Sequence, residues 1–359
     1  MEKDSGELKM VKNAFIMLLG LVCISCNSTK TEIDKRCQSG VVLVYHVDYY
    51  SLTLPNGIIL YFSGDADGNI TNVSFDEDDI EKSMGIGTGF FISKDGKIAT
   101  NKHVAARTLS DRSIRRLTKQ IVNMIVDELK NQNKVAEQLQ QQFAYQYNNS
   151  NDASEKAKLK QNYNDLGEEI EKNIKITKEL ERSDVEGADI EYHNEFLGIA
   201  YNGTFVKTME DFYPCTLRDT SSYDLAIIQL NSKETPKGRY VFQIPSKNML
   251  EHYSFGEYIS RLSGSDKNEE LLLIGFNKGL TIGQTEEGVF SQCMDGSISL
   301  DEKDRILYSI ATLPGSSGSP VLNRRGQLVA VNYAGYSQTQ SFNLGIKAIH
   351  LTELVQKKQ

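Results

Sequence analysis

The chain has 359 residues, a length that allows two or three domains and a sizeable buried core. Its 40 basic and 48 acidic side chains give a formal charge of −8. This balance offers no basic surface for a phosphate backbone, so the composition disfavours nucleic acid as a partner. No two histidines have the spacing of a metal-ligand pair, and the sequence predicts neither a metal site nor a cofactor.

The N-terminal segment predicts export from the cytoplasm. Lys9 and Lys12 precede an apolar run over residues 14–24, which has the length of a signal-peptide core, whereas a membrane-spanning helix needs about 20 residues. The run ends in a small residue before Cys26, which resembles the cleavage site of bacterial lipoproteins. We therefore expect a signal peptide over residues 1–26, a lipid anchor on Cys26, and a periplasmic or outer-membrane-facing location in the bacterial cell envelope. The alternative is cleavage at an ordinary signal site and free secretion.

Three cysteines follow this segment, at Cys37, Cys215 and Cys293. An odd number permits one disulfide in an oxidising compartment. The sequence does not indicate which pair forms, if any.

Strand patterns surround a helical insertion. After a polar tether over residues 27–39, alternating apolar stretches predict β-structure over residues 40–109 and again over 191–240. Residues 110–190 are poor in glycine and have apolar residues at helical spacing. They contain a polar break where Asn151 or Asp152 can cap a second helix. We expect an inserted helical hairpin that buries its own seam. A coiled coil that binds a protein partner is the alternative, less favoured because the apolar repeat is short and interrupted.

The C-terminal segment, residues 241–359, returns to strand patterns and ends in a predicted short helix over residues 351–356. It contains the glycine-rich turn Pro314-Gly-Ser-Ser-Gly-Ser-Pro320 with Ser317 at its centre. Such a turn exposes a nucleophile beside backbone N–H donors, and the N–H groups of Gly315 and Ser317 are the expected oxyanion hole.

Three polar residues occur in the order His103, Asp224, Ser317. A serine hydroxyl is a weak nucleophile near neutral pH, so an imidazole must remove its proton, and a carboxylate must orient that imidazole. An α/β-hydrolase would require a different order of these residues and a Gly-x-Ser-x-Gly elbow. The order found here is that of a chymotrypsin-like protease.

Five motifs, one of them Asp95-Gly96, resemble trypsin-like serine proteases of the HtrA and glutamyl-endopeptidase type. The other four are Gly87-Thr-Gly-Phe-Phe-Ile92, Thr100-Asn-Lys-His-Val104, Asp224-Leu-Ala-Ile227 and Gly315-Ser-Ser-Gly-Ser-Pro320. The resemblance implies a mostly β fold of two packed six-stranded antiparallel barrels, interrupted by the helical hairpin. It also implies that His103 is the base, Asp224 the orienting acid and Ser317 the nucleophile.

The same resemblance places Ala311, Thr312 and Asn332 at the substrate pocket. No acidic side chain stands there, which disfavours cleavage after Lys or Arg. Thr312 matches the glutamyl-endopeptidase pattern, but Asn332 stands where that pattern has His. We expect a preference for small or medium uncharged side chains.

The sequence therefore predicts a cell-envelope serine endopeptidase that cleaves polypeptides through an acyl-enzyme. The alternative is a catalytically latent protease-fold module whose helical insertion binds a protein partner.

Overall fold

The computed structural model describes residues 29–64, 69–106, 111–185, 187–250, 270–335 and 342–356. The expected signal peptide and Cys26 lie outside the described residues. The chain divides into two compact units. The first comprises Met1–His46, Gly85–Arg107 and Phe196–Gln359, and the second comprises Val47–Met84 and Thr108–Glu195.

Six strands form the N-terminal barrel. In spatial order they are β1 (Val41–Thr53), β4 (Ser83–Phe91), β5 (Lys97–Asn101), β8 (Leu225–Leu230), β7 (Tyr213–Thr220) and β6 (Asp189–Tyr201). A pairing between β1 and β6 closes the barrel. The apolar runs that predicted strands therefore form one closed sheet, with β8 buried along its whole length.

A second closed barrel contains six antiparallel strands. In spatial order they are β12 (Gln292–Asp301), β13 (Arg305–Tyr308), β16 (Asn343–Lys347), β15 (Leu328–Gly335), β14 (Pro320–Asn323) and β9 (Glu270–Gly275). The helix α8 (Leu351–Gln356) follows, as expected. The predicted fold of two six-stranded barrels is confirmed.

Several short elements lie between these strands. They are α3 (Lys102–Ala105), α7 (Leu280–Gly283), the pair β10 (Gln284–Thr285) and β11 (Gly288–Val289), and the 3₁₀ turns Gln38–Gly40, Glu77–Asp79, Met209–Asp211 and Ala348–His350. None of the described helices is both long and apolar enough to cross a membrane.

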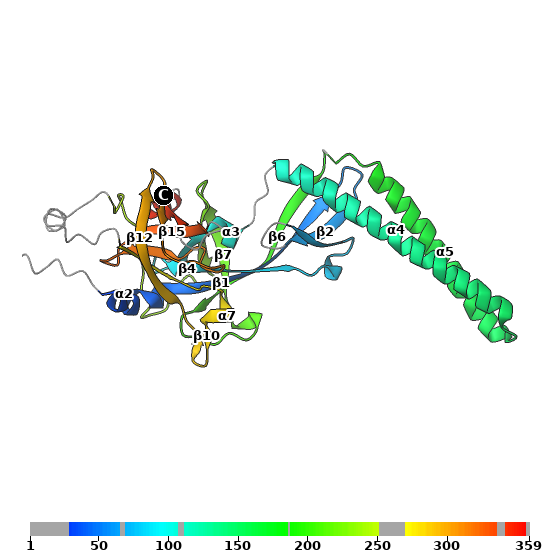
Figure 1. The fold of residues 1–359 in the computed structure, drawn as a ribbon, viewed down its shortest axis with the longest axis horizontal. Coiled ribbons are helices and arrows are strands. Elements are labelled where there is room, and N and C mark those ends of the chain that lie inside the picture. The colour runs from blue at the N-terminus through cyan, green and yellow to red at the C-terminus, as the bar shows by residue number, and fades with distance from the viewer. Residues whose placement is uncertain are drawn as a thin grey trace, which may run out of the picture. The chain divides into compact units, whose positions relative to one another are not determined.

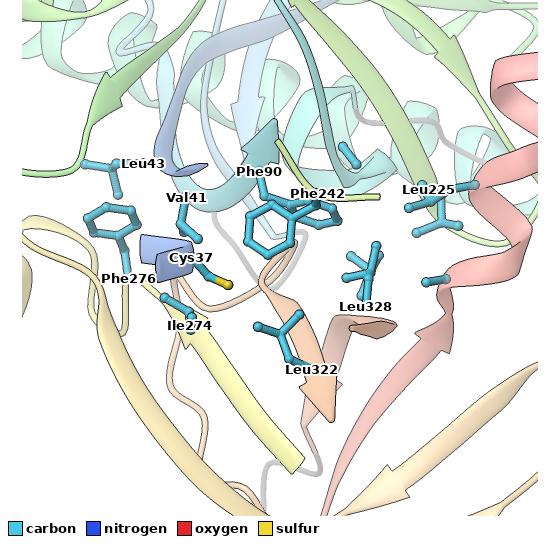
Figure 2. Close-up of a cluster of buried hydrophobic side chains, with 14 of the residues drawn as sticks. Cys37, Val41, Leu43, Phe90, Leu225, Phe242, Ile274, Phe276, Leu322 and Leu328 are labelled. Atoms are coloured by element: carbon cyan, nitrogen blue, oxygen red, sulfur yellow. The ribbon is translucent and has the colours of Figure 1, made fainter. Parts of the chain in front are cut away.

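One apolar cluster joins the two barrels within the first unit (Figure 2). Phe90 of β4 and Phe242 are fully buried and pack edge to face with ring centroids 5.1 Å apart. Ile274 of β9 and Leu322 of β14 belong to the same cluster. Because the cluster draws on strands of both barrels, burial of its surface fixes one barrel on the other.

The structure corrects the expected polar tether over residues 27–39. Residues Lys30–Cys37 form the helix α2, which begins with a capping box between Thr29 and Glu32. Ile33 and Cys37 are fully inaccessible and belong to the cluster between the barrels. The segment is polar overall, but two apolar side chains four residues apart lie on one face of a helix and are buried there.

The second unit contains the helical hairpin (Figure 1). The helices α4 (Asp111–Asn149) and α5 (Ala153–Glu181) run side by side, and Asp152 caps α5 by accepting from the N–H groups of Ser154 and Glu155. The strands β2 (Ile59–Gly64) and β3 (Ile70–Ser74) belong to this unit as well, and they extend the N-terminal sheet beyond β1. The unit thus includes residues that the sequence analysis assigned to the first barrel, because their apolar side chains pack against α4.

The seam of the hairpin is apolar near the strands and contains polar contacts further along. Near the strands, α4 buries the side chains of Leu117, Ile121, Ile125 and Leu129. Further along, the seam between the helices contains a hydrogen bond of 3.0 Å between Asn173 and Asn133, and Gln140 donates to the carbonyl of Tyr163 at 2.9 Å.

Candidate active site

His103 lies directly after strand β5, in the single helical turn α3. Its neighbours Val104 and Ala105 are buried in the N-terminal barrel, and they anchor the turn. A Cβ at Gly87 would lie 2.4 Å from a methyl carbon of Val104, so the glycine makes room for that anchor. The His103 side chain itself is 46% exposed. The imidazole is therefore firmly positioned and yet accessible.

Asp224 holds His103 by two hydrogen bonds. The imidazole Nδ1 lies 2.7 Å from Oδ2 of Asp224, and the backbone N–H of His103 donates to Oδ1 at 3.0 Å. The carboxylate thus fixes the position of the backbone and the orientation of the ring. It also selects the tautomer with a proton on Nδ1, which leaves Nε2 free to accept a proton.

The backbone at Asp224 is left-handed, with φ of 60°. Its carbonyl accepts from the N–H of Lys102 at 3.0 Å and from the amide of Asn101 at 3.1 Å. The hydroxyl of Ser221 accepts from the N–H groups of Tyr223 and Leu225 just before β8. Aspartate is one of the few residues that tolerates this conformation, so side-chain chemistry and backbone shape both favour it here.

The turn around Ser317 depends on two glycines. Gly315 has φ of 97° and Gly318 has φ of 87°. A Cβ at Gly318 would lie 2.0 Å from the carbonyl oxygen of Thr88, and one at Gly315 would lie 2.5 Å from that of Phe276. Both positions need glycine for conformation and for space.

Two N–H groups of this turn are unused. The N–H of Ser316 donates to Leu313, that of Gly318 to Asn332, and that of Ser319 to Ser316. Within the part of the chain that the structure describes, the N–H groups of Gly315 and Ser317 donate to no acceptor. These are the two donors that the sequence predicts for an oxyanion hole.

Thr88 of β4 ties the turn to the N-terminal barrel. Its N–H donates to the carbonyl of Ser317 at 2.8 Å, and its hydroxyl donates to the carbonyl of Gly315 at 2.8 Å. The carbonyl of Thr88 in turn accepts from the hydroxyl of Thr100, three residues before His103. Thr88 is fully buried and was part of a sequence motif, but the motif did not reveal that its side chain contacts the turn.

Ser317 is partly exposed, and no hydrogen bond joins it to His103 in the described structure. A serine–histidine pair within 2.7 Å occurs elsewhere, between Ser51 Oγ and His193 Nε2 in the second unit. Ser51 lies in a regular strand, where the N–H groups of a tight glycine turn are lacking. The second pair is therefore a structural hydrogen bond between two strands.

The three predicted pocket residues have different surroundings. Ala311 is exposed. The hydroxyl of Thr312 donates to Oδ1 of Asn343 at 2.6 Å. Asn332 is only 1% exposed and bonds to Ser316 and Tyr308. The sequence analysis did not single out Tyr308 or Asn343, because their partners lie 24 and 31 residues away in the chain.

Cys37, Cys215 and Cys293 are all free thiols. Burial raises the pKa of Cys215 and of Cys293 to about 12 and also raises the pKa of Cys37. Since the thiolate is the reactive form, none of them is an activated nucleophile. Across the described residues, no group of three or more acidic, histidine or cysteine side chains has the arrangement of a metal site.

Comparison with known proteins gives one family match and several similar solved structures. Residues 193–331 match the family described as trypsin-like peptidase domain, a region that includes Asp224 and Ser317 but not His103. No curated protein matches the chain. Among solved structures, the HtrA-type protease AlgW with a tripeptide has 12% identity and a TM-score of 0.43, and the match covers 91% of this chain and 62% of that one. A serine endoprotease from Yersinia pestis has 13% identity and a TM-score of 0.42, with 92% and 66% covered.

The chain spans less than two thirds of the length of either solved structure. The two closed six-stranded barrels are the chymotrypsin-like fold that the sequence predicted. Residues 193–331 match the model of the trypsin-like peptidase domain, which agrees with the resemblance seen in the sequence.

Proposed function

We propose that this protein is a serine endopeptidase in which Ser317 attacks the peptide carbonyl, His103 accepts the hydroxyl proton and Asp224 orients and stabilises the imidazolium. The observation that carries this proposal is the pair of hydrogen bonds that His103 donates to the Asp224 carboxylate, at 2.7 and 3.0 Å. A buried structural histidine would not need its ring and its backbone held by one carboxylate. A general base does, because its unbound nitrogen must keep a fixed direction.

The reaction has two steps. The Ser317 oxygen bonds to the carbonyl carbon, the proton moves to Nε2 of His103, and the negative carbonyl oxygen binds the free N–H groups of Gly315 and Ser317. The amine then leaves with the proton from His103, which produces an acyl-enzyme. Water, deprotonated by His103, releases the acid and restores the serine.

Cleavage of a diverse peptide library, read by mass spectrometry, tests this proposal. Wild-type protein should produce new termini, and Ser317→Ala and His103→Ala should each reduce the rate by at least about 10³-fold, since loss of one triad member removes most of the acceleration. The residues before the cut should be small or medium and uncharged. Unchanged cleavage in Ser317→Ala would refute the proposal.

The second candidate function is a latent protease-fold module whose hairpin, α4 and α5, binds a protein partner. It is favoured by the lack of a hydrogen bond between Ser317 and His103 in the described structure. Hydrogen bonds of this kind are often long in unliganded sites and tighten with substrate, which favours the enzyme. A folded wild type that cleaves nothing in the library would favour the latent module.

We also propose that the protein is attached to the cell envelope by a lipid on Cys26. The support is the sequence alone, an apolar run of signal-peptide length that ends before this cysteine. Cys26→Ala should move the protein from the membrane fraction to the soluble fraction of an expressing bacterium. Equal membrane retention of both forms would contradict lipidation.

A further inference from the structure

Asn332 lies behind the nucleophile turn with both ends of its amide engaged. It is 1% exposed on strand β15. Its Nδ2 donates to the carbonyl of Ser316 at 2.9 Å and contacts the hydroxyl of Ser316 at 3.2 Å, and its Oδ1 accepts from the hydroxyl of Tyr308 at 2.6 Å. A carbonyl can only accept, so the Nδ2 end must face Ser316 and the Oδ1 end must face Tyr308. Both ends of the amide are engaged and the residue is almost inaccessible, so Asn332 is poorly placed to meet a substrate side chain.

Tyr308 keeps this orientation because its hydroxyl retains its proton at neutral pH. It is fully buried inside the C-terminal barrel, and burial raises the pKa of its hydroxyl well above the ordinary value. The hydroxyl therefore remains a donor. It holds the Oδ1 end of Asn332 and so keeps the Nδ2 end directed at the turn.

The hydrogen bond from Asn332 to the carbonyl of Ser316 fixes the direction of the Ser317 N–H. In a trans peptide the carbonyl of one residue and the N–H of the following residue point in opposite directions. The carbonyl of Ser316 accepts from Nδ2 of Asn332 and from the N–H of Ser319 at 3.1 Å. To turn the Ser317 N–H away from its present direction, both hydrogen bonds would have to break.

The other unused donor is fixed in the same way. The carbonyl of Pro314 accepts from the N–H of Lys278 at 2.6 Å, which sets the opposite direction for the N–H of Gly315. Lys278 and Gly279 both have a positive φ, of 56° and 50°. Each of the two donor peptides is thus held from its carbonyl side.

We propose that Asn332, oriented by Tyr308, is a positioning residue that presets the Ser317 N–H for the oxyanion, and that it does not form a wall of the substrate pocket. This inference rests on the proposed peptidase function. The physical gain is preorganisation: donors already aimed at the developing charge need no reorganisation during the reaction. The proposal assigns to Asn332 an effect on the transition state and none on the choice of substrate side chain.

The test compares wild-type protein with Asn332→Asp and Tyr308→Phe. The aspartate has the same shape but presents oxygen to the Ser316 carbonyl, so kcat should fall about 10²-fold, the lower end of the range for loss of one oxyanion donor, while KM changes less than about threefold. Tyr308→Phe removes one oxygen atom and should lower kcat about tenfold. In both variants the affinity for a peptide boronic acid should fall in parallel with kcat/KM, since this ligand mimics the transition state. The preferred residue at the cleavage site should stay the same.

Asn323→Ala is the matched control. Asn323 is also a buried asparagine of the C-terminal barrel, 7% exposed, and accepts from the N–H groups of Arg325 and Gln327. Its side-chain hydrogen bonds in the described structure all go to Arg325 and Gln327, so its loss should lower the melting temperature and leave kcat unchanged. This control separates a general loss of stability from a specific loss of orientation.

A kcat of Asn332→Asp within about twofold of wild type, or an altered cleavage preference, would overturn the inference while the peptidase proposal stands. If Asn332→Asp does not fold, Tyr308→Phe decides the question by the same two criteria. A wild type that neither cleaves peptides nor binds the boronic acid would instead refute the proposed function, and the positioning role with it.

Discussion

At the residue scale, Asp224 meets two requirements, one for its carboxylate and one for its backbone conformation. Its carboxylate holds His103, and its backbone has φ of 60°. Asp224→Asn should keep the fold, since asparagine also tolerates this conformation, but should reduce kcat about 10⁴-fold because the amide favours the wrong imidazole tautomer. Asp224→Ala should be as inactive and about 1 kcal/mol less stable in addition, because alanine is strained there. Kinetics and urea unfolding of the two variants check this, and an asparagine variant with wild-type kcat would contradict the assigned role.

Gly318 offers a second residue-scale prediction. A Cβ there would lie 2.0 Å from the carbonyl oxygen of Thr88, and the backbone φ of 87° is unfavourable for alanine. Gly318→Ala should therefore lose both stability, by roughly 1–3 kcal/mol of strain, and activity. Gly238→Ala is the matched control, because Gly238 has a similar φ of 84° with nothing within 4 Å. Equal activity in the two alanine variants would show that the close approach to Thr88 is unimportant.

At the element scale, helix α2 should be part of the core. Ile33 is fully buried in the cluster between the barrels, so Ile33→Ala should lower the free energy of unfolding by about 2–5 kcal/mol. Lys35→Ala is the control within the same helix, since Lys35 is exposed. Chemical denaturation measures both. A cost below about 0.5 kcal/mol for Ile33→Ala would mean that the segment is the tether that its polar composition suggests.

The outer part of the hairpin should be dispensable for chemistry. Asn133 and Asn173 are hydrogen-bonded across the seam, so a short glycine-rich loop can replace residues 134–172 and join the two helices. We expect the shortened protein to cleave peptides within about threefold of the wild-type rate, because His103, Asp224 and Ser317 all belong to the other unit. A loss of more than tenfold in a folded shortened protein would show that the hairpin takes part in catalysis.

At the scale of the whole molecule, the buried thiols should make the protein sensitive to alkali. The pKa of Cys215 is about 12 in the folded protein against an ordinary value of 9.0, so between these values the unfolded chain loses a proton that the folded chain keeps. Stability should therefore fall as pH rises above 9, by at most about 1.4 kcal/mol per pH unit for this thiol. Melting temperatures between pH 7 and 10.5 check this. Cys215→Ala should flatten the decline, and an identical pH dependence in the variant would contradict the assignment.

The sequence predicted those parts of the molecule that depend on local patterns. Alternating apolar residues revealed the strands, and the glycines around Ser317 revealed the turn. Helix α2 was missed although Thr29 and Glu32 form a capping box. The segment is mostly polar, and its two buried positions, Ile33 and Cys37, were too few to indicate a helix. The direction of the Asn332 amide was not predictable, since it depends on Tyr308 and Ser316, which only the closed barrel brings within reach.

The most direct test of the central claim is labelling of the protein with a fluorophosphonate, a probe that requires an activated serine. We predict that wild-type protein is labelled on Ser317, that Ser317→Ala and His103→Ala are not labelled, and that Ser51→Ala is labelled like wild type. Ser51 is the matched control because it already lies 2.7 Å from a histidine and yet lacks the glycine turn. Absence of labelling in folded wild type, or labelling that survives in Ser317→Ala, would contradict the claim that His103, Asp224 and Ser317 form a working active site.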